Sequence, residues 1–196
     1  MPKTVNLIVV GAFLLMAGCA SSSAVVTYHL LHPVAAPVEA GHWDPSTYVV
    51  VGPVELPSYL DRPQMVSRRS DHTLSVNEYQ RWAEPLDEGI ARTVAENLSQ
   101  LTGGEKMFLY PFDAPKASAT MQVFMDVVRF DTDEAGKAVL DVRWGLKNGK
   151  RETLLTRHTS LSGVVDGEDQ PARARALSRL VAEFSRDVAR TLVNPE

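Results

Sequence analysis

The chain has 196 residues, of which 44% are hydrophobic, 22% charged and 7% aromatic. This is the composition of an ordinary globular protein, and it excludes a largely disordered or collagen-like chain. A formal net charge of −4 gives no sign of a nucleic-acid-binding surface. The single cysteine excludes an internal disulfide and a multi-cysteine zinc site. The length suits one domain preceded by a short segment.

The N-terminus has the features of a secretory signal. Residues 7–17 are apolar but too few to cross a bilayer, because a spanning helix needs about 20 apolar residues. The stretch Met16-Ala17-Gly18-Cys19 resembles the lipobox of bacterial lipoproteins, although Met16 stands where leucine is usual. We therefore expect residues 1–18 to be a lipoprotein signal peptide and Cys19 to receive the lipid. The alternatives are an uncleaved anchor, or a signal peptide followed by a cysteine without that role.

The residues from Cys19 onward predict a tether and then a folded domain. Residues 20–24 (ASSSA) are small and polar, as suits a flexible linker. We expect residues 19–27 to form a lipidated flexible tether and residues 28–196 a single α+β periplasmic domain. Ala20 follows the cysteine, and in the lipoproteins that the motif resembles, the absence of aspartate at this place favours the outer membrane.

Short apolar and alternating runs predict the strands. Residues 28–31 predict a short strand, and a proline-rich connector follows at 32–45. Residues 48–56 predict a buried strand with a kink or bulge at Gly52-Pro53. The other predicted strands are a hairpin at 65–68 and 73–76, a short strand at 107–110, and a three-stranded antiparallel meander at 119–131, 137–147 and 152–162.

Two amphipathic helices are predicted, at residues 84–102 and 170–192. Apolar side chains recur every three or four residues in both segments. Pro85 fits the first helical position of the earlier helix, and Gly103 provides its stop. The side chains expected to face the sheet are Ile90, Val94, Leu180 and Phe184.

The order of these elements predicts an α+β fold. Strands, a helix, a meander and a second helix suit a single two-layer domain. We expect a mostly antiparallel sheet with the two amphipathic helices packed on one face.

The sequence offers no catalytic or metal-binding constellation. Of the five histidines, only His29 and His32 are close together, and a zinc site would need further ligands. No nucleophile elbow, P-loop or dinucleotide-binding fingerprint occurs. Cys19 could not act as a nucleophile once acylated. We therefore expect a protein that is not an enzyme and uses no cofactor or metal.

One loop is unusually constrained. Residues 51–66 (VGPVELPSYLDRPQMV) contain three prolines and a glycine, and prolines restrict the backbone. The loop carries Tyr59, Leu60 and Arg62 between two predicted strands. A loop with a preset shape loses little entropy on binding, so these three residues are candidates for protein contact.

The segment before the first predicted helix completes the candidate contact site. Its sequence EYQRWAEPL contains Trp82 and Glu84, which we expect to support the loop. Tyrosine, tryptophan and arginine are frequent at the energetic centres of interfaces. The structural alternative is that Tyr59 and Trp82 fill the core while Arg81 pairs with Glu84 or with the aspartate of the loop. A ligand site is a third hypothesis.

These two stretches resemble the PqiC (YmbA-like) lipoproteins, a family also described as ABC-type transport auxiliary lipoproteins. The similarity rests on VGPVELPSYLDRPQMV, followed by RWAEPL and an amphipathic helix. It covers almost the entire mature chain, including the opening Tyr28-His29-Leu30-Leu31. The imperfect lipobox is the visible departure from the family pattern.

The resemblance implies a function that composition and spacing do not show. Family members sit at the outer membrane facing the periplasm and partner a PqiB-like MCE-domain protein that projects from the inner membrane. The resemblance therefore implies a non-enzymatic, outer-membrane-anchored subunit of an MCE-type intermembrane lipid transport system that supports membrane integrity. The subunit would contact outer-membrane lipid through the acylated Cys19. A homo-oligomeric ring around the partner is plausible within the family.

Other functions compete with this expectation. A lipoprotein chaperone or plug for another envelope-assembly machine would share the lipid anchor and the small α+β domain. An envelope hydrolase would need a nucleophile and a base, which the sequence does not provide. No feature of the sequence indicates a nucleic-acid partner.

Overall fold

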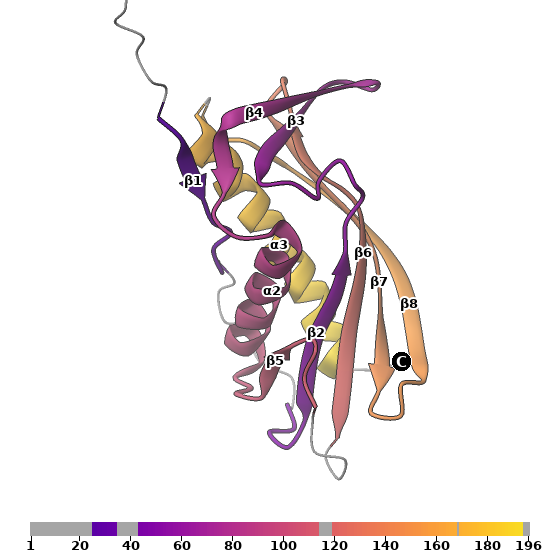
Figure 1. The fold of residues 1–196 in the computed structure, drawn as a ribbon. Helices are drawn as coiled ribbons and strands as arrows, with labels where there is room; N and C mark the ends of the chain where they lie inside the picture. The colour runs from indigo at the N-terminus through magenta and orange to yellow at the C-terminus, as the bar shows by residue number, and fades with distance from the viewer. Residues whose placement is uncertain (1–24, 35–42, 114–118, 168, 194–196) are drawn as a thin grey trace, which may run out of the picture.

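The computed structural model describes residues 25–34, 43–113, 119–167 and 169–193. The predicted signal peptide, Cys19 and most of the tether lie outside the described residues, as does most of the predicted connector. The described residues form a single domain of two helices and a curled sheet (Figure 1). The elements are β1 (Thr27–His29), β2 (Tyr48–Glu55), β3 (Gln64–Ser70), β4 (Thr73–Trp82), α2 (Leu86–Thr102), β5 (Met107–Leu109), β6 (Thr120–Asp133), β7 (Lys137–Asn148), β8 (Thr153–Val164) and α3 (Gln170–Val193).

The sheet is mixed, so the prediction of a mostly antiparallel sheet is wrong. The strand order is β1-β4-β3-β6-β2-β5, with β7 pairing with β6 and β8 pairing with β7. The predicted meander is present, since β6, β7 and β8 pair antiparallel, as do β3 and β4. The β1–β4, β2–β5, β2–β6 and β3–β6 pairs are parallel. Periodicity predicts strands but not their neighbours. Helix α2 carries the chain back so that β5 runs alongside β2 in the same direction, and β6 then starts again beside Tyr48 and also runs parallel to β2.

One face of the meander is apolar and packs against α3. Along β7, Leu140, Val142 and Trp144 are buried, whereas Arg143 on the other face is exposed. This alternation follows from the pleat, because successive side chains of a strand point to opposite faces. The Trp144 ring meets the Phe184 ring of α3 edge to face, with 5.6 Å between centroids. The helices lie side by side, and the sheet curls around them (Figure 1).

The predicted apolar faces of both helices are confirmed. Ile90, Val94, Leu180 and Phe184 are each at most 3% exposed and belong to one core. Helix α2 packs against α3, β2 and β5, and α3 packs against β6, β7 and β8. A phenylalanine or leucine buried in such a core stabilises a domain by about 2–5 kcal/mol relative to alanine.

The first helix begins slightly later than predicted. Pro85 has an extended backbone (ψ 134°) and caps α2, which starts at Leu86, so Pro85 is not the first helical residue. The predicted stop at Gly103 is confirmed. Gly103 adopts the left-handed conformation, with φ of 69°, and its N–H donates to the Ser99 carbonyl over 2.9 Å. A residue without a Cβ adopts this φ at little cost.

The predicted irregularity in β2 is confirmed at Gly52-Pro53. The pairing of β2 with β6 shifts register between Val51 and Val54. The Gln122 side-chain amide donates to the Gly52 carbonyl over 2.8 Å, which satisfies an acceptor that the ladder leaves free. Gly52 has φ of 113°, a backbone conformation that side-chain-bearing residues rarely adopt. Beyond this bulge the chain enters the loop at residues 56–63.

Candidate functional site

The loop at residues 56–63 is closed by its own backbone. The Leu60 N–H donates to the Pro57 carbonyl and the Arg62 N–H to the Leu60 carbonyl, each over 2.8 Å. At the far end, the Trp82 N–H donates to the Pro63 carbonyl over 2.7 Å. The Leu60 side chain is only 3% exposed and joins the core. The loop is therefore a firmly attached part of the domain.

The structure separates the five predicted contact residues into two kinds. Leu60 and Trp82 are buried in the same core, and Tyr59 is half-buried against it. Arg62 is exposed, and Glu84 is half-buried at the start of α2. Leu60 and Trp82 thus support the loop from within. Of the five residues, Arg62 is the one whose side chain is exposed and therefore accessible to a partner. That protein contact remains a prediction.

Tyr59 adjoins a buried group of charges that sequence analysis missed. Asp131 is fully buried on β6 and accepts from two arginines, Arg68 Nη2 at 3.1 Å and Arg129 Nε at 2.8 Å. The Tyr59 hydroxyl and the Arg68 Nε are both buried without a hydrogen-bond partner among the described residues. Burial raises the pKa of Tyr59 above its ordinary value, and the nearby Asp131 carboxylate raises this pKa further.

The buried aspartate has a structural role in this arrangement. A buried carboxylate is costly unless it is paired and hydrogen-bonded, and here it holds β3 to β6 through Arg68. These two strands pair directly over a very short stretch, Ser67 with Thr132 and Arg68 with Asp133. The sequence signal that could have found this group is an aspartate in a strand next to a buried apolar residue, Phe130.

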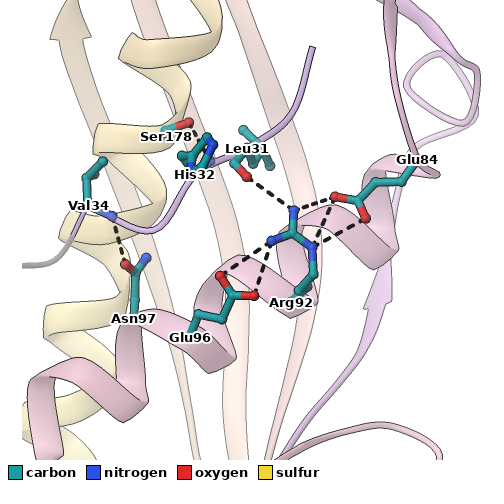
Figure 2. Close-up of polar contacts among 8 residues, drawn as sticks. All are labelled: Leu31, His32, Val34, Glu84, Arg92, Glu96, Asn97 and Ser178. Atoms are coloured by element: carbon teal, nitrogen blue, oxygen red, sulfur yellow. Dashed lines mark hydrogen bonds and ion pairs between the residues drawn. The ribbon is translucent and has the colours of Figure 1, made fainter. Parts of the chain in front are cut away.

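A second polar site lies where the N-terminal segment, residues 25–34, meets the helices (Figure 2). Arg92 of α2 is its centre. The Arg92 guanidinium pairs with Glu84 and with Glu96, and its Nη2 donates to the Leu31 carbonyl over 3.2 Å. The hydrogen bond with Glu84 raises the pKa of Arg92 above its ordinary range. Arg92 therefore ties the N-terminal segment to the start of α2.

Two further helix side chains hold the same segment. The Val34 N–H donates to the Asn97 Oδ1 over 3.1 Å, and the His32 N–H donates to the Ser178 Oγ over 3.2 Å (Figure 2). Asn97 is fully buried, and its Nδ2 donates to the Ser185 Oγ over 3.3 Å. One amide therefore joins α2, α3 and the N-terminal segment.

The sequence contained a partial signal for this site. Asn97 falls on the apolar face of α2, three residues after Val94 and four before Leu101, and a buried amide requires partners. The pairing of Glu84 with Arg81 that the structural alternative allowed is wrong. Arg81 instead pairs with Glu78, three residues before it, and Glu84 reaches Arg92 because helix α2 turns Arg92 toward it.

In both sites the charged side chains pair with one another and hold segments of the chain together, β3 to β6 in one site and the N-terminal segment to α2 in the other. Among residues 25–34, 43–113, 119–167 and 169–193, no group of three or more histidine, cysteine or acidic side chains could hold a metal ion. Within the same ranges, neither helix is long and apolar enough to cross a membrane.

Comparison with known proteins identifies the family. The family model of the ABC-type transport auxiliary lipoprotein component matches residues 28–189. The chain belongs to this family, which confirms the resemblance found in the sequence. The match covers every strand from β2 to β8, all of α2, and most of β1 and α3.

Named relatives and solved structures agree with this assignment. The chain is 27% identical to the intermembrane transport lipoprotein PqiC of Escherichia coli, over 91% of this chain and 95% of that one. The PqiC protein of Shigella flexneri matches equally well. A crystal structure of a Xanthomonas campestris protein has the same fold, with a TM-score of 0.70, 18% identity, and coverage of 85% of this chain and 95% of the other.

Proposed function

We propose that this protein is an outer-membrane-anchored lipoprotein subunit of an MCE-type intermembrane lipid transport system. It faces the periplasm, docks a periplasm-spanning MCE-domain partner and supports the integrity of the membrane. The observation that carries the proposal is the match to an intermembrane transport lipoprotein over 95% of that relative's length. The match covers almost all of that relative, and the relatives are named as transport lipoproteins, which favours a role without catalysis.

The anchor in this proposal is Cys19, after removal of residues 1–18. The tether at residues 19–27 then leads into the domain at residues 28–196. The attachment of residues 31–34 to both helices supports this arrangement, because a segment held by Arg92, Asn97 and Ser178 transmits the position of the anchor to the domain.

The partner in this proposal contacts the exposed side of the loop at residues 56–63. Arg62 supplies a guanidinium there, and its neighbour Asp61 is exposed as well. Buried Leu60 keeps the loop in shape before the partner arrives, so little entropy is lost on docking. Strand β8 is an edge of the sheet as described, pairing with β7 alone, and such an edge suits contacts between copies in a homo-oligomeric ring.

Co-purification from native membranes tests the proposal. The acylated wild-type protein, tagged at its C-terminus, should recover an MCE-domain protein from detergent-solubilised envelopes. Arg62→Glu should lower that recovery severalfold without lowering the melting temperature, since Arg62 is exposed. Arg151→Glu is the matched control, because Arg151 is exposed in the turn between β7 and β8, at the end of the sheet where β2 begins and not where β2 enters the loop.

The outcomes separate the parts of the proposal. Failure of the wild type to recover any MCE-domain protein would contradict the transport function. Recovery that is equal for Arg62→Glu and wild type would contradict only the contact at the loop. Release of Cys19→Ser from the membrane would support the anchor, and its retention in high salt would contradict the anchor.

A further inference from the structure

The outer face of the N-terminal segment is apolar, which is unusual for an edge strand. Strand β1 pairs with β4 along one side. His29 at its end and Leu31 two residues further on are buried in the protein, where they are 7% and 2% exposed. The alternate side chains point outward, and all of them from Val26 to Leu30 are apolar. Val26 is 36% exposed, Tyr28 61% and Leu30 47%. Edge strands usually carry charged or polar residues on an exposed face.

This apolar face borders a groove whose other wall is basic. Tyr28, Leu30 and Val34 line one side of a groove of about 810 Å³, and α3 lines the other. Arg175, Arg179 and Arg186 of α3 reach into the groove. Their spacing of four and seven residues places them in one row along the helix.

The arginines of this row are accessible for an external anion. Arg175 pairs with Asp169 at 3.8 Å. Arg179 pairs with Asp166 at 3.0 Å, and its Nη2 also donates to the Val164 carbonyl over 2.8 Å. Both aspartates are largely exposed, and such ion pairs exchange readily. Glu183 also lines the groove. Arg186 makes no ion pair within the part of the chain that the structure describes.

We propose that the outer face of residues 25–34, together with the arginine row of α3, is a surface that lies in the headgroup layer of a membrane containing anionic lipid. The proposal rests on the anchor at Cys19 given under Proposed function. Five residues lie between Cys19 and Val25, so six steps of extended chain keep Val25 within about 20 Å of the anchored cysteine. The exposed apolar side chains that follow the anchor most closely in the sequence are Val25, Val26, Tyr28 and Leu30.

The chemistry of the two walls fits such a layer. A tyrosine places its ring against apolar chains and its hydroxyl in water, so it is favoured at the boundary of a bilayer. An arginine buries its aliphatic stem while its guanidinium stays with phosphates. Basic side chains near the surface strengthen binding when the membrane carries anionic lipids.

Quenching by brominated lipid tests the proposal on the acylated full-length protein. Tyr28→Trp places a fluorophore on the proposed surface. Leu154→Trp is the matched control, because Leu154 is 48% exposed and β8 begins at the end of the molecule opposite β1 (Figure 1). Both variants are reconstituted into vesicles of brominated phosphatidylcholine with or without phosphatidylglycerol, and wild-type fluorescence, which contains the native tryptophans, is subtracted.

The expected result is at least about twofold stronger quenching of Tyr28→Trp than of Leu154→Trp in the anionic vesicles. Replacing the three arginines of the row by glutamine in the Tyr28→Trp background should weaken the quenching in the anionic vesicles.

Equal quenching of the two tryptophan variants would overturn the proposal. Weak quenching of Tyr28→Trp because a second copy or a partner protein covers the residue would overturn it as well. Equal quenching with and without phosphatidylglycerol would overturn the preference for anionic lipid. Flotation of the same vesicles reports the anchor separately, so protein that floats without quenching contradicts only this inference, and protein that does not float contradicts the anchor.

Discussion

Two irregular segments of the domain are fixed in different ways. The loop at residues 56–63 is shaped by hydrogen bonds among its own residues and by one buried leucine, Leu60. In the N-terminal segment, residues 25–34, strand β1 pairs with β4, and residues 31–34 take their partners from the helices, through Arg92, Asn97 and Ser178. The shape of the loop is therefore largely local. The position of residues 31–34 depends on the packing of α2 against α3, because their partners come from both helices.

Removing the buried leucine of the loop should have the largest effect. Leu60→Ala should lower the free energy of unfolding by about 2–5 kcal/mol, because it deletes a side chain packed in the core. Arg62→Ala, on the exposed side of the same loop, should change it by less than about 0.5 kcal/mol. Denaturant unfolding of both variants measures the difference. If the two variants were equally stable, the loop would not be held from within and the contrast would fail.

Removing the buried amide that serves the N-terminal segment should have an intermediate effect. Asn97→Ala leaves the Val34 N–H without its acceptor and the Ser185 hydroxyl without a donor, so the free energy of unfolding should fall by about 1–3 kcal/mol. Gln100→Ala is the control, since Gln100 is exposed on the same helix. Thermal unfolding of both variants provides the measurement. A loss no larger than that of Gln100→Ala would mean that Asn97 contributes little to holding the segment.

The tyrosine of the loop should show the smallest effect and should reveal it only at high pH. The pKa of Tyr59 is raised in the folded protein, so the folded state holds the phenolic proton more firmly than the unfolded state does. The resulting stabilisation is complete below about pH 10 and is lost as the pH rises through the folded pKa. Tyr59→Phe removes this component, so its stability should fall less steeply than that of wild type above about pH 10. Parallel curves from urea unfolding across this range would contradict the raised pKa.

Sequence analysis found the features whose causes are local. Alternation predicted β6, β7 and β8, and the three-to-four-residue spacing predicted the buried faces of both helices. The irregularity at Gly52-Pro53 could be predicted because proline cannot donate a ladder hydrogen bond and glycine allows backbone conformations that other residues rarely adopt.

The features that sequence analysis missed depend on contacts between distant residues. The parallel pairing of β2 with β5 and β6 follows from the path of the chain, which no periodicity records. Arg92 meets the Leu31 carbonyl across 61 positions of the sequence, and Ser178 meets the His32 N–H across 146. The sequence predicted Arg62 as an exposed candidate and Trp82 as a support, but it also placed Leu60 on the contact edge, because composition does not show which side of a loop faces the core.

Amide hydrogen exchange along the N-terminal segment tests most directly whether the anchor and the domain form one unit. In the acylated wild-type protein, the amides of His32 and Val34 should be protected, because both donate to helix side chains. Arg92→Gln and Asn97→Ala should each speed their exchange while leaving the core of α3 protected. Exchange of these two amides in the wild type at the rate of an unstructured peptide would contradict the account, since the tether would then reach the domain through a free chain.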